Sequence, residues 1–217
     1  MSRAYDSVIF DLDGTLIDSA PGILQAYEAA FLHCGVTPCR PWSTDLIGPP
    51  LQQTIVMQCG SQDPLLLESL RAEFIACYDS DGFRLSTPYF GIQDLLKMLQ
   101  SRGVRQFIAT NKRIVPTQSI LSHLGWDEMF EGVFGVDSLT AAQTPKADVI
   151  DYITHTFGLT GERSLYVGDR LEDYEAAFTA GLPFALATWG FGDAEATVPP
   201  TCARAHSAES LGRLLCG

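Results

Sequence analysis

From residue 105 onward, short apolar runs alternate with amphipathic segments, and this alternation constrains the fold more than any other feature of the chain. Strand-like apolar runs cover 105–110, 132–136, 164–167 and 183–187, and helical periodicity covers about 116–124, 145–157 and 171–180. Strands that alternate with helices form parallel sheets through right-handed crossovers. We therefore predict an α/β core built on a parallel sheet.

One more strand, at 7–10, stands far upstream, and the stretch that separates it from the others is helical. Apolar residues recur at helical spacing from 23 to 34, and further helices are expected at about 51–59 and 64–79, with no convincing strand between 20 and 80. Turn-forming residues gather near 17–20 and 81–90. The sequence predicts a core domain of residues 1–17 and 84–217, interrupted by a helical domain of residues 18–83.

Charge and composition narrow the class of protein. Apolar residues make up 46% of the 217, enough for a well-filled core. The 14 Lys and Arg against 26 Asp and Glu give a net charge of −12, which argues against nucleic-acid binding. The N-terminus has no signal-peptide pattern, no stretch approaches the ~20 apolar residues of a membrane span, and the six cysteines have no metal-ligand spacing. We expect a cytoplasmic protein that contacts no membrane, as a monomer or homodimer.

Asp11 and Asp13 follow the first strand directly. Residues i and i+2 of an extended segment point to the same side, and ligand sites of open α/β sheets lie at the carboxyl ends of strands. Two adjacent carboxylates repel each other unless a cation intervenes. The pair is typical of a metal site or of a nucleophile beside a proton-transferring acid, although a solvated turn would use the same residues.

Asp169 and Asp173 follow a later strand in the same way. Their oxygens, together with those of the first pair, are the hard ligands that Mg²⁺ requires. Taken alone, acids in the first turn of a helix also fit plain helix capping.

Three further polar residues stand at positions suited to phosphate. Thr110 and Asn111 end the strand at 105–110, where a hydroxyl and backbone amides could hold a phosphate oxygen, or simply begin a polar loop. Lys146 falls in the first turn of a helix, where the helix dipole disfavours a cation. Its placement indicates a pairing with a carboxylate or a phosphate, with a solvated surface lysine as the alternative.

Four segments in a fixed order resemble the four motifs of the haloacid dehalogenase superfamily of phosphatases. They are Asp11-Leu12-Asp13-Gly14-Thr15, Ala109-Thr110-Asn111, Thr144-Pro145-Lys146-Ala147-Asp148 and Gly168-Asp169-Arg170-Leu171-Glu172-Asp173. The match spans nearly the whole chain. It implies a Rossmann-like three-layer core with strand order 5-4-1-2-3, and it makes the inserted helices a type-1 cap.

The resemblance also implies a role for each residue. Asp11 would attack phosphorus, and Asp13 would protonate the leaving oxygen and then activate water. Leu12, Thr110, Asn111 and Lys146 would hold the phosphoryl group. Asp11, Asp13 through its carbonyl, Asp169 and Asp173, the last directly or through water, would bind Mg²⁺. The implied reaction is the hydrolysis of a small phosphorylated metabolite through an aspartyl phosphate.

Within the superfamily, Ile47-Gly48-Pro49-Pro50 and the Gly-Asp-Arg form of the last motif resemble the phosphoglycolate-phosphatase-like group. Two segments depart from that pattern, at 88–91 and at 168–175, and leave the substrate open. We expect Ile47 and Gly48, with Arg84 or Arg113, to read the substrate.

Other functions fit parts of this pattern. A dehalogenase would lack the acid at position 13, and a signalling receiver domain would be shorter and carry no inserted helices. A phosphomutase or a 5'-nucleotidase-like hydrolase on the same scaffold, and an inactive phosphate-binding module, stay open as alternatives.

Overall fold

The computed structural model describes residues 5–139, 144–192 and 197–217. Residues 1–4, with which the predicted core domain and the N-terminal pattern begin, lie outside the described residues.

A six-stranded sheet forms the centre of the fold, and every neighbouring pair in it is parallel. The strands are β1 (Ser7–Phe10), β4 (Arg105–Ala109), β5 (Gly132–Phe134), β6 (Ser164–Gly168), β7 (Phe184–Ala187) and β8 (Ala203–Ala205). Their order is β5-β4-β1-β6-β7-β8. Counted along the core, the first five strands have the predicted order 5-4-1-2-3, and β8 extends the β7 edge. The α/β prediction is confirmed; β8 was not predicted, because three residues in a polar stretch carry no strand pattern.

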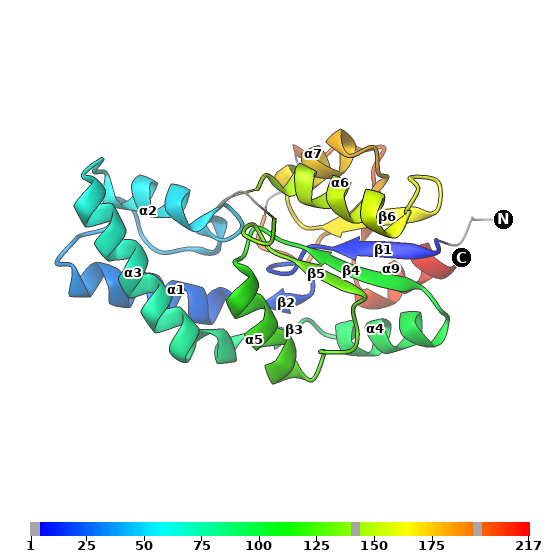
Figure 1. Ribbon diagram of the computed structural model, residues 1–217, viewed down its shortest axis with the longest axis horizontal. Coiled ribbons are helices and arrows are strands. Elements are labelled where there is room, and N and C mark those ends of the chain that lie inside the picture. Colours follow the sequence, from blue (N-terminus) through cyan, green and yellow to red (C-terminus); the bar gives the residue numbers. More distant parts are fainter. Residues whose placement is uncertain (1–4, 140–143, 193–196) are drawn as a thin grey trace.

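Helices cover both faces of this sheet and make a three-layer core (Figure 1). One face carries α4 (Ile92–Ser101), α5 (Ile114–Leu124) and α9 (Ala208–Cys216), and the other carries α6 (Lys146–Phe157) and α7 (Leu171–Thr179). Val8 and Phe10 of β1 pack into one apolar cluster, whereas Ile9 packs into the other. A central strand buried on both faces reads as a continuous apolar run, which is how β1 appears in the sequence.

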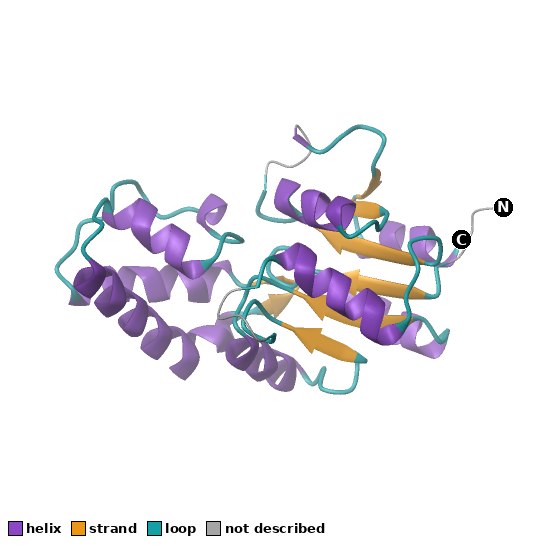
Figure 2. Cartoon of the chain, turned by 45° about the horizontal axis from the view of Figure 1, so that its top comes forward, coloured by secondary structure: helices purple, strands orange, loops and turns teal. Residues whose placement is uncertain are grey.

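Residues 20–85 form a helical group beside the carboxyl ends of the strands (Figures 1 and 2). It contains α1 (Ala20–His33), α2 (Leu51–Cys59) and α3 (Pro64–Ser80), with short 3-10 turns η1 (Thr44–Leu46) and η2 (Gly82–Leu85). The apolar faces that the periodicity indicates are buried in α1 and α3. Asp63 begins α3 by accepting a hydrogen bond from the Leu65 amide at 3.0 Å, as an N-cap residue does.

The chain enters and leaves this helical group through a small antiparallel ribbon. Its strands are β2 (Ile17–Asp18) and β3 (Thr87–Pro88), in which Ile17 pairs with Pro88 and Asp18 with Thr87. The ribbon was not predicted, because a two-residue strand leaves no alternating pattern and a proline argues against one. It brings the two segments that join the helical group to the core side by side. Among the described residues, no helix has the length and apolarity to cross a membrane.

Candidate active site

The register of the sheet brings the ends of three strands to one level. Phe10 of β1 lies opposite Ile108 of β4 and Val167 of β6. The polar residues that follow these strands, among them Asp11, Thr110 and Asp169, therefore emerge at the same edge of the sheet. β1 is central, and the chain order reverses on either side of it, so this edge is the switch point at which α/β sheets bind ligands.

Lys146 joins two of the predicted acidic residues. Its Nζ lies 2.8 Å from Oδ1 of Asp11 and 2.6 Å from Oδ1 of Asp173, and all three side chains are more than 90% buried. Burial by itself lowers the pKa of Lys146, but Asp11 and Asp173 raise it well above its usual value. The cation that the helix dipole disfavours at the start of α6 is therefore stabilised by two carboxylates.

Asp173 is held by backbone and side-chain donors at the start of α7. Its Oδ2 accepts from the amides of Asp169 at 3.2 Å and Arg170 at 3.1 Å. The hydroxyl of Tyr166, which donates to the Ala109 carbonyl at 3.0 Å, also lies 3.4 Å from Oδ1 of Asp173. These contacts fix the carboxylate, and they make Asp173 both a helix cap and a member of the site.

Asp169 is buried between two loops that close over it. Its Oδ2 accepts from the Phe191 amide at 2.8 Å, and its Oδ1 accepts from the Thr15 hydroxyl at 3.3 Å. Gly14 adopts a φ of +87°, and a Cβ there would lie 2.3 Å from Oδ2 of Asp169. The Asp-x-Asp-Gly segment thus needs a glycine, because any side chain at position 14 would displace this carboxylate.

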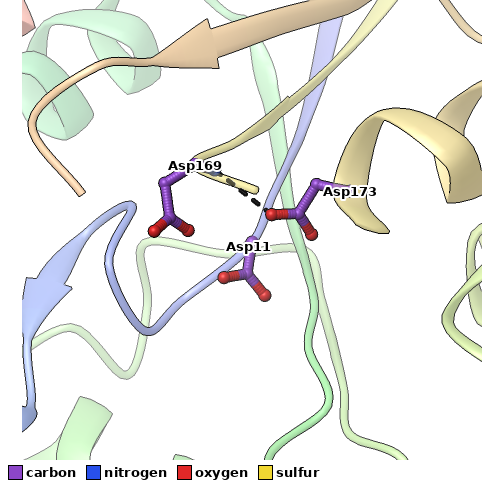
Figure 3. Close-up of side chains that lie close together, drawn as sticks. All are labelled: Asp11, Asp169 and Asp173. Atoms are coloured by element: carbon purple, nitrogen blue, oxygen red, sulfur yellow. Dashed lines mark hydrogen bonds between the residues drawn. The ribbon is translucent and has the colours of Figure 1, made fainter. Parts of the chain in front are cut away.

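Asp11, Asp169 and Asp173 converge on one point (Figure 3), with one carboxylate oxygen from each lying within 4.8 Å of the others. Burial raises the pKa of Asp11 to about 8, against the lowering effect of Lys146, and burial together with Asp173 raises the pKa of Asp169 to about 7. When all three carboxylates are ionised, they and the Lys146 ammonium leave two negative charges in a buried space. A divalent cation with oxygen ligands, such as Mg²⁺, matches both that charge and that donor set.

Asp13 has a cation of its own. Nζ of Lys112 lies 3.0 Å from each of its carboxylate oxygens and 4.6 Å from the centre of the Tyr78 ring. The Lys112 and Asp13 side chains are 7% and 10% exposed. Asp13 therefore pairs with a different lysine from Asp11, although it comes only two residues after it.

The predicted phosphate-binding residues lie at the same edge. Thr110 is buried, and its hydroxyl accepts a hydrogen bond from the Lys112 amide at 3.2 Å. Asn111 instead donates its side-chain amide to the Gly48 carbonyl at 3.0 Å. Leu12 is buried, and its carbonyl accepts from three amides of the turn after β1.

Core side chains hold the loop that contains Ile47 and Gly48. Arg170 donates to the carbonyls of Ile47 at 3.1 Å and Asp45 at 2.9 Å, and Asn111 binds Gly48 as described. Gly48 has a φ of +114°, and a Cβ there would lie 2.5 Å from the Arg170 side chain. Arg170 and Asn111 thus hold the loop over the site, and they directly follow the predicted site residues Asp169 and Thr110 in the sequence.

A cavity of about 250 Å³ lies between this loop, the helical group and the strand ends, and it is lined by Asp11, Asp13, Thr110 and Asn111. Ile47, Gly48 and Arg113 also line it, as expected of substrate-reading residues. Arg84 does not: its side chain is 57% exposed on η2 and lies beside Asp81.

Sequence reasoning assigned no role to several residues that shape this site. Lys112, Tyr166, Arg170 and Phe191 all contact a predicted site residue. Lys112 and Arg170 stand next to predicted residues, so their proximity along the chain is a usable signal. Tyr166 lies within a strand, and Phe191 contributes only its backbone, so neither has a sequence signature.

Comparison with known proteins agrees with this geometry. The model of the haloacid dehalogenase-like hydrolase family matches residues 8–187. A phosphoglycolate phosphatase of Cereibacter sphaeroides is 35% identical over 189 residues, which cover 85% of each chain. The tyrosine-protein kinase PtkA of Mycobacterium tuberculosis is 34% identical over 190 residues, 87% of this chain, but the match spans only 64% of that protein.

A solved structure gives the same result for the fold. The haloacid dehalogenase-like family protein SP0104 of Streptococcus pneumoniae superposes with a TM-score of 0.84 at 29% identity, covering 97% of this chain and 98% of that one. The family resemblance inferred from the four segments is confirmed. The chain belongs to the haloacid dehalogenase-like hydrolases.

Proposed function

We propose that the chain hydrolyses a small-molecule phosphate monoester through an aspartyl phosphate on Asp11, with Mg²⁺ as cofactor. The convergence of Asp169, Asp173 and Lys146 on Asp11, which lines the cavity, carries this proposal. The phosphoglycolate phosphatase among its relatives supports a small phosphorylated substrate. The kinase activity in the name of the mycobacterial relative is not carried over, because the match leaves about a third of that protein uncovered.

Asp11 is the nucleophile in this proposal. Lys146 binds its Oδ1, and no described residue donates to its Oδ2. An oxygen of Asp11 forms a bond to phosphorus while the ester P–O bond breaks. Because phosphoryl transfer depends on positioning and on charge stabilisation, Lys146 contributes by holding Asp11 and by offsetting negative charge on the phosphoryl oxygens.

Asp13 moves the protons. It gives a proton to the leaving alcohol oxygen in the first step. In the second step it takes a proton from a water that attacks phosphorus, which releases inorganic phosphate and restores Asp11. Lys112 holds both oxygens of Asp13, and so orients the carboxyl group toward the cavity that it lines.

Asp11, Asp169 and Asp173, with the carbonyl of Asp13, would hold Mg²⁺. When bound, the ion supplies positive charge that masks the repulsion between these carboxylates and the phosphate dianion. Thr110 and the backbone at Leu12 and Asn111 complete the phosphoryl-binding set that we propose.

We further propose that residues 18–83 act as a cap over a core of residues 1–17 and 84–217. The antiparallel ribbon where the chain enters and leaves the helical group supports this division. The hydrogen bonds from Arg170 and Asn111 to the loop at Ile47 and Gly48 support the placement of the cap over the core. The six cysteines are free, which supports the predicted cytoplasmic location.

The test is a hydrolysis assay of the purified protein with Mg²⁺ against a panel of small phosphate monoesters, with release of inorganic phosphate as the readout. Asp11→Asn is the test variant. Asp151→Asn, on the exposed face of α6, is a control that makes the same change of charge. We expect Mg²⁺-dependent hydrolysis by the wild type and the control but not by Asp11→Asn. Equal release by Asp11→Asn, or transfer of phosphate within the substrate without release, would contradict the proposal.

A further inference from the structure

The cavity above Asp11 has two chemically different halves. The strand ends supply a polar floor, which includes Asp11, Asp13 and Thr110. The helical group supplies an apolar wall of aromatic rings. The centroid of the Phe74 ring lies 4.5 Å from that of Tyr27 and 5.7 Å from that of Tyr78. A phosphate monoester bound with phosphorus at Asp11 would place its leaving group against this aromatic wall.

The volume of the cavity sets the size of the group that it can enclose. An apolar cavity of about 150 Å³ holds one benzene ring. The cavity here measures about 250 Å³, which is room for a phosphoryl group and roughly one such ring. Aromatic side chains bind a flat ring favourably by stacked or edge-to-face packing.

Charges in the cavity wall oppose an acidic leaving group. Each cation of the described lining already has a carboxylate partner: Lys112 binds Asp13, Arg113 lies 2.6 Å from Asp79, and Arg71 lies 2.7 Å from Glu68. The Arg71 pair is 40% and 62% exposed, so it stands toward solvent rather than in the depth of the cavity.

One more carboxylate adds to this opposition. Asp137 also lines the cavity and accepts a hydrogen bond from the Ile114 amide at 2.7 Å. A carboxylate on the leaving group would therefore lose its water without gaining an unpaired cation, which is costly.

We infer that this site selects phosphate monoesters whose leaving group is uncharged, largely apolar and about the size of a single six-membered ring, in preference to esters of hydroxy acids. The inference rests on the proposed function and specifies its substrate class. Arg113, which the sequence assigns to substrate reading, takes no part in binding an acid, because Asp79 of α3 neutralises it.

The test compares benzyl phosphate with 4-carboxybenzyl phosphate, which adds an acidic group to the same ring, and with phosphoglycolate as a small acidic ester. We expect kcat/KM for benzyl phosphate to exceed that for each acidic ester by about tenfold or more, because the acidic group would be buried without a partner. Equal or better use of either acidic ester would overturn the inference.

A variant changes the selectivity in a predictable direction. Asp79→Asn frees the Arg113 guanidinium, and the preference for benzyl over 4-carboxybenzyl phosphate should then fall by about threefold or more. Asp151→Asn makes the same change of net charge on the exposed face of α6 and should leave the preference unchanged. An equal response of both variants would show that overall charge, not Arg113, sets the preference.

Binding separates this inference from the proposed function. Calorimetric titration of Asp11→Asn with each ester in the presence of Mg²⁺ measures selectivity without turnover. Tighter binding of benzyl phosphate, with no hydrolysis by the wild type, would uphold the inference and defeat the proposed function. Equal binding of the two benzyl esters, or no binding of benzyl phosphate, would overturn the inference whether or not the wild type hydrolyses esters.

Discussion

Replacing Lys146 with methionine tests how much the buried ion pairs of the site contribute to stability and activity. The substitution keeps most of the side-chain volume and removes a cation that lies 2.8 Å from Asp11 and 2.6 Å from Asp173. Breaking a buried ion pair by removing one partner costs about 3–5 kcal/mol. We expect a loss of that size in the free energy of unfolding without metal, and a smaller loss with Mg²⁺.

Activity should fall as well, because Lys146 is placed to offset charge on the phosphoryl group. Removing one preorganised donor of this kind lowers kcat by about 10²–10³. The assays are urea unfolding with and without Mg²⁺, and steady-state hydrolysis at saturating ester. Lys97→Met, on the exposed side of α4, controls for the loss of one lysine and should behave like the wild type.

A double variant sharpens the same prediction. Lys146→Met with Asp173→Asn removes one of the carboxylates that the single change leaves unpaired, so it should regain much of the lost stability without regaining activity. If Lys146→Met stays within about 0.5 kcal/mol and tenfold of the wild type, a range typical of a surface substitution, the buried cluster does not work as described.

Three other outcomes follow from the site. Without metal, the pKa values of about 8 for Asp11 and about 7 for Asp169 lie above the usual 3.8, so Tm measured in EDTA should fall as pH rises from 6 to 9. Mg²⁺ should raise Tm more at pH 9 than at pH 6. A Tm that rises with pH in EDTA would contradict these pKa shifts. Gly14→Ala should destabilise the fold by about 1–3 kcal/mol and lower kcat, because its Cβ would lie 2.3 Å from an Asp169 oxygen. Urea unfolding and phosphate release measure the two effects. An unchanged free energy of unfolding and an unchanged kcat would refute the close approach. Arg170→Met removes the hydrogen bond to the Ile47 carbonyl and should raise KM about tenfold with kcat nearly unchanged; a fall in kcat alone would assign Arg170 to the chemistry.

The sequence predicted the location of the site well where that location depends on the order and ends of the strands. Asp11 and Asp169 each follow an apolar run, and parallel strands end at a common edge, so the meeting of the two residues could be predicted once the strand order was expected. The unfavourable position of Lys146 at a helix start also indicated an anionic partner, either a carboxylate or a phosphate. In the structure that lysine has two, Asp11 and Asp173.

Contacts that depend on the conformation of loops could not be predicted from the sequence. The Phe191 amide reaches Asp169 from the loop after β7, and a backbone donor has no residue type to recognise. The pairing of Lys112 with Asp13 depends on a turn after β4 that buries a lysine. The edge strand β8 and the β2–β3 ribbon are too short to leave a periodic pattern.

The central claim, that Asp11 becomes phosphorylated, is most directly tested by rapid acid quench. The protein is mixed with Mg²⁺ and ³²P-labelled phenyl phosphate, quenched within one turnover, and digested so that the labelled peptide can be sequenced. We predict label on the peptide that contains Asp11, absent from Asp11→Asn and sensitive to hydroxylamine, as an acyl phosphate is. Label on any other residue, or turnover with no label on the protein at any quench time, would contradict the account.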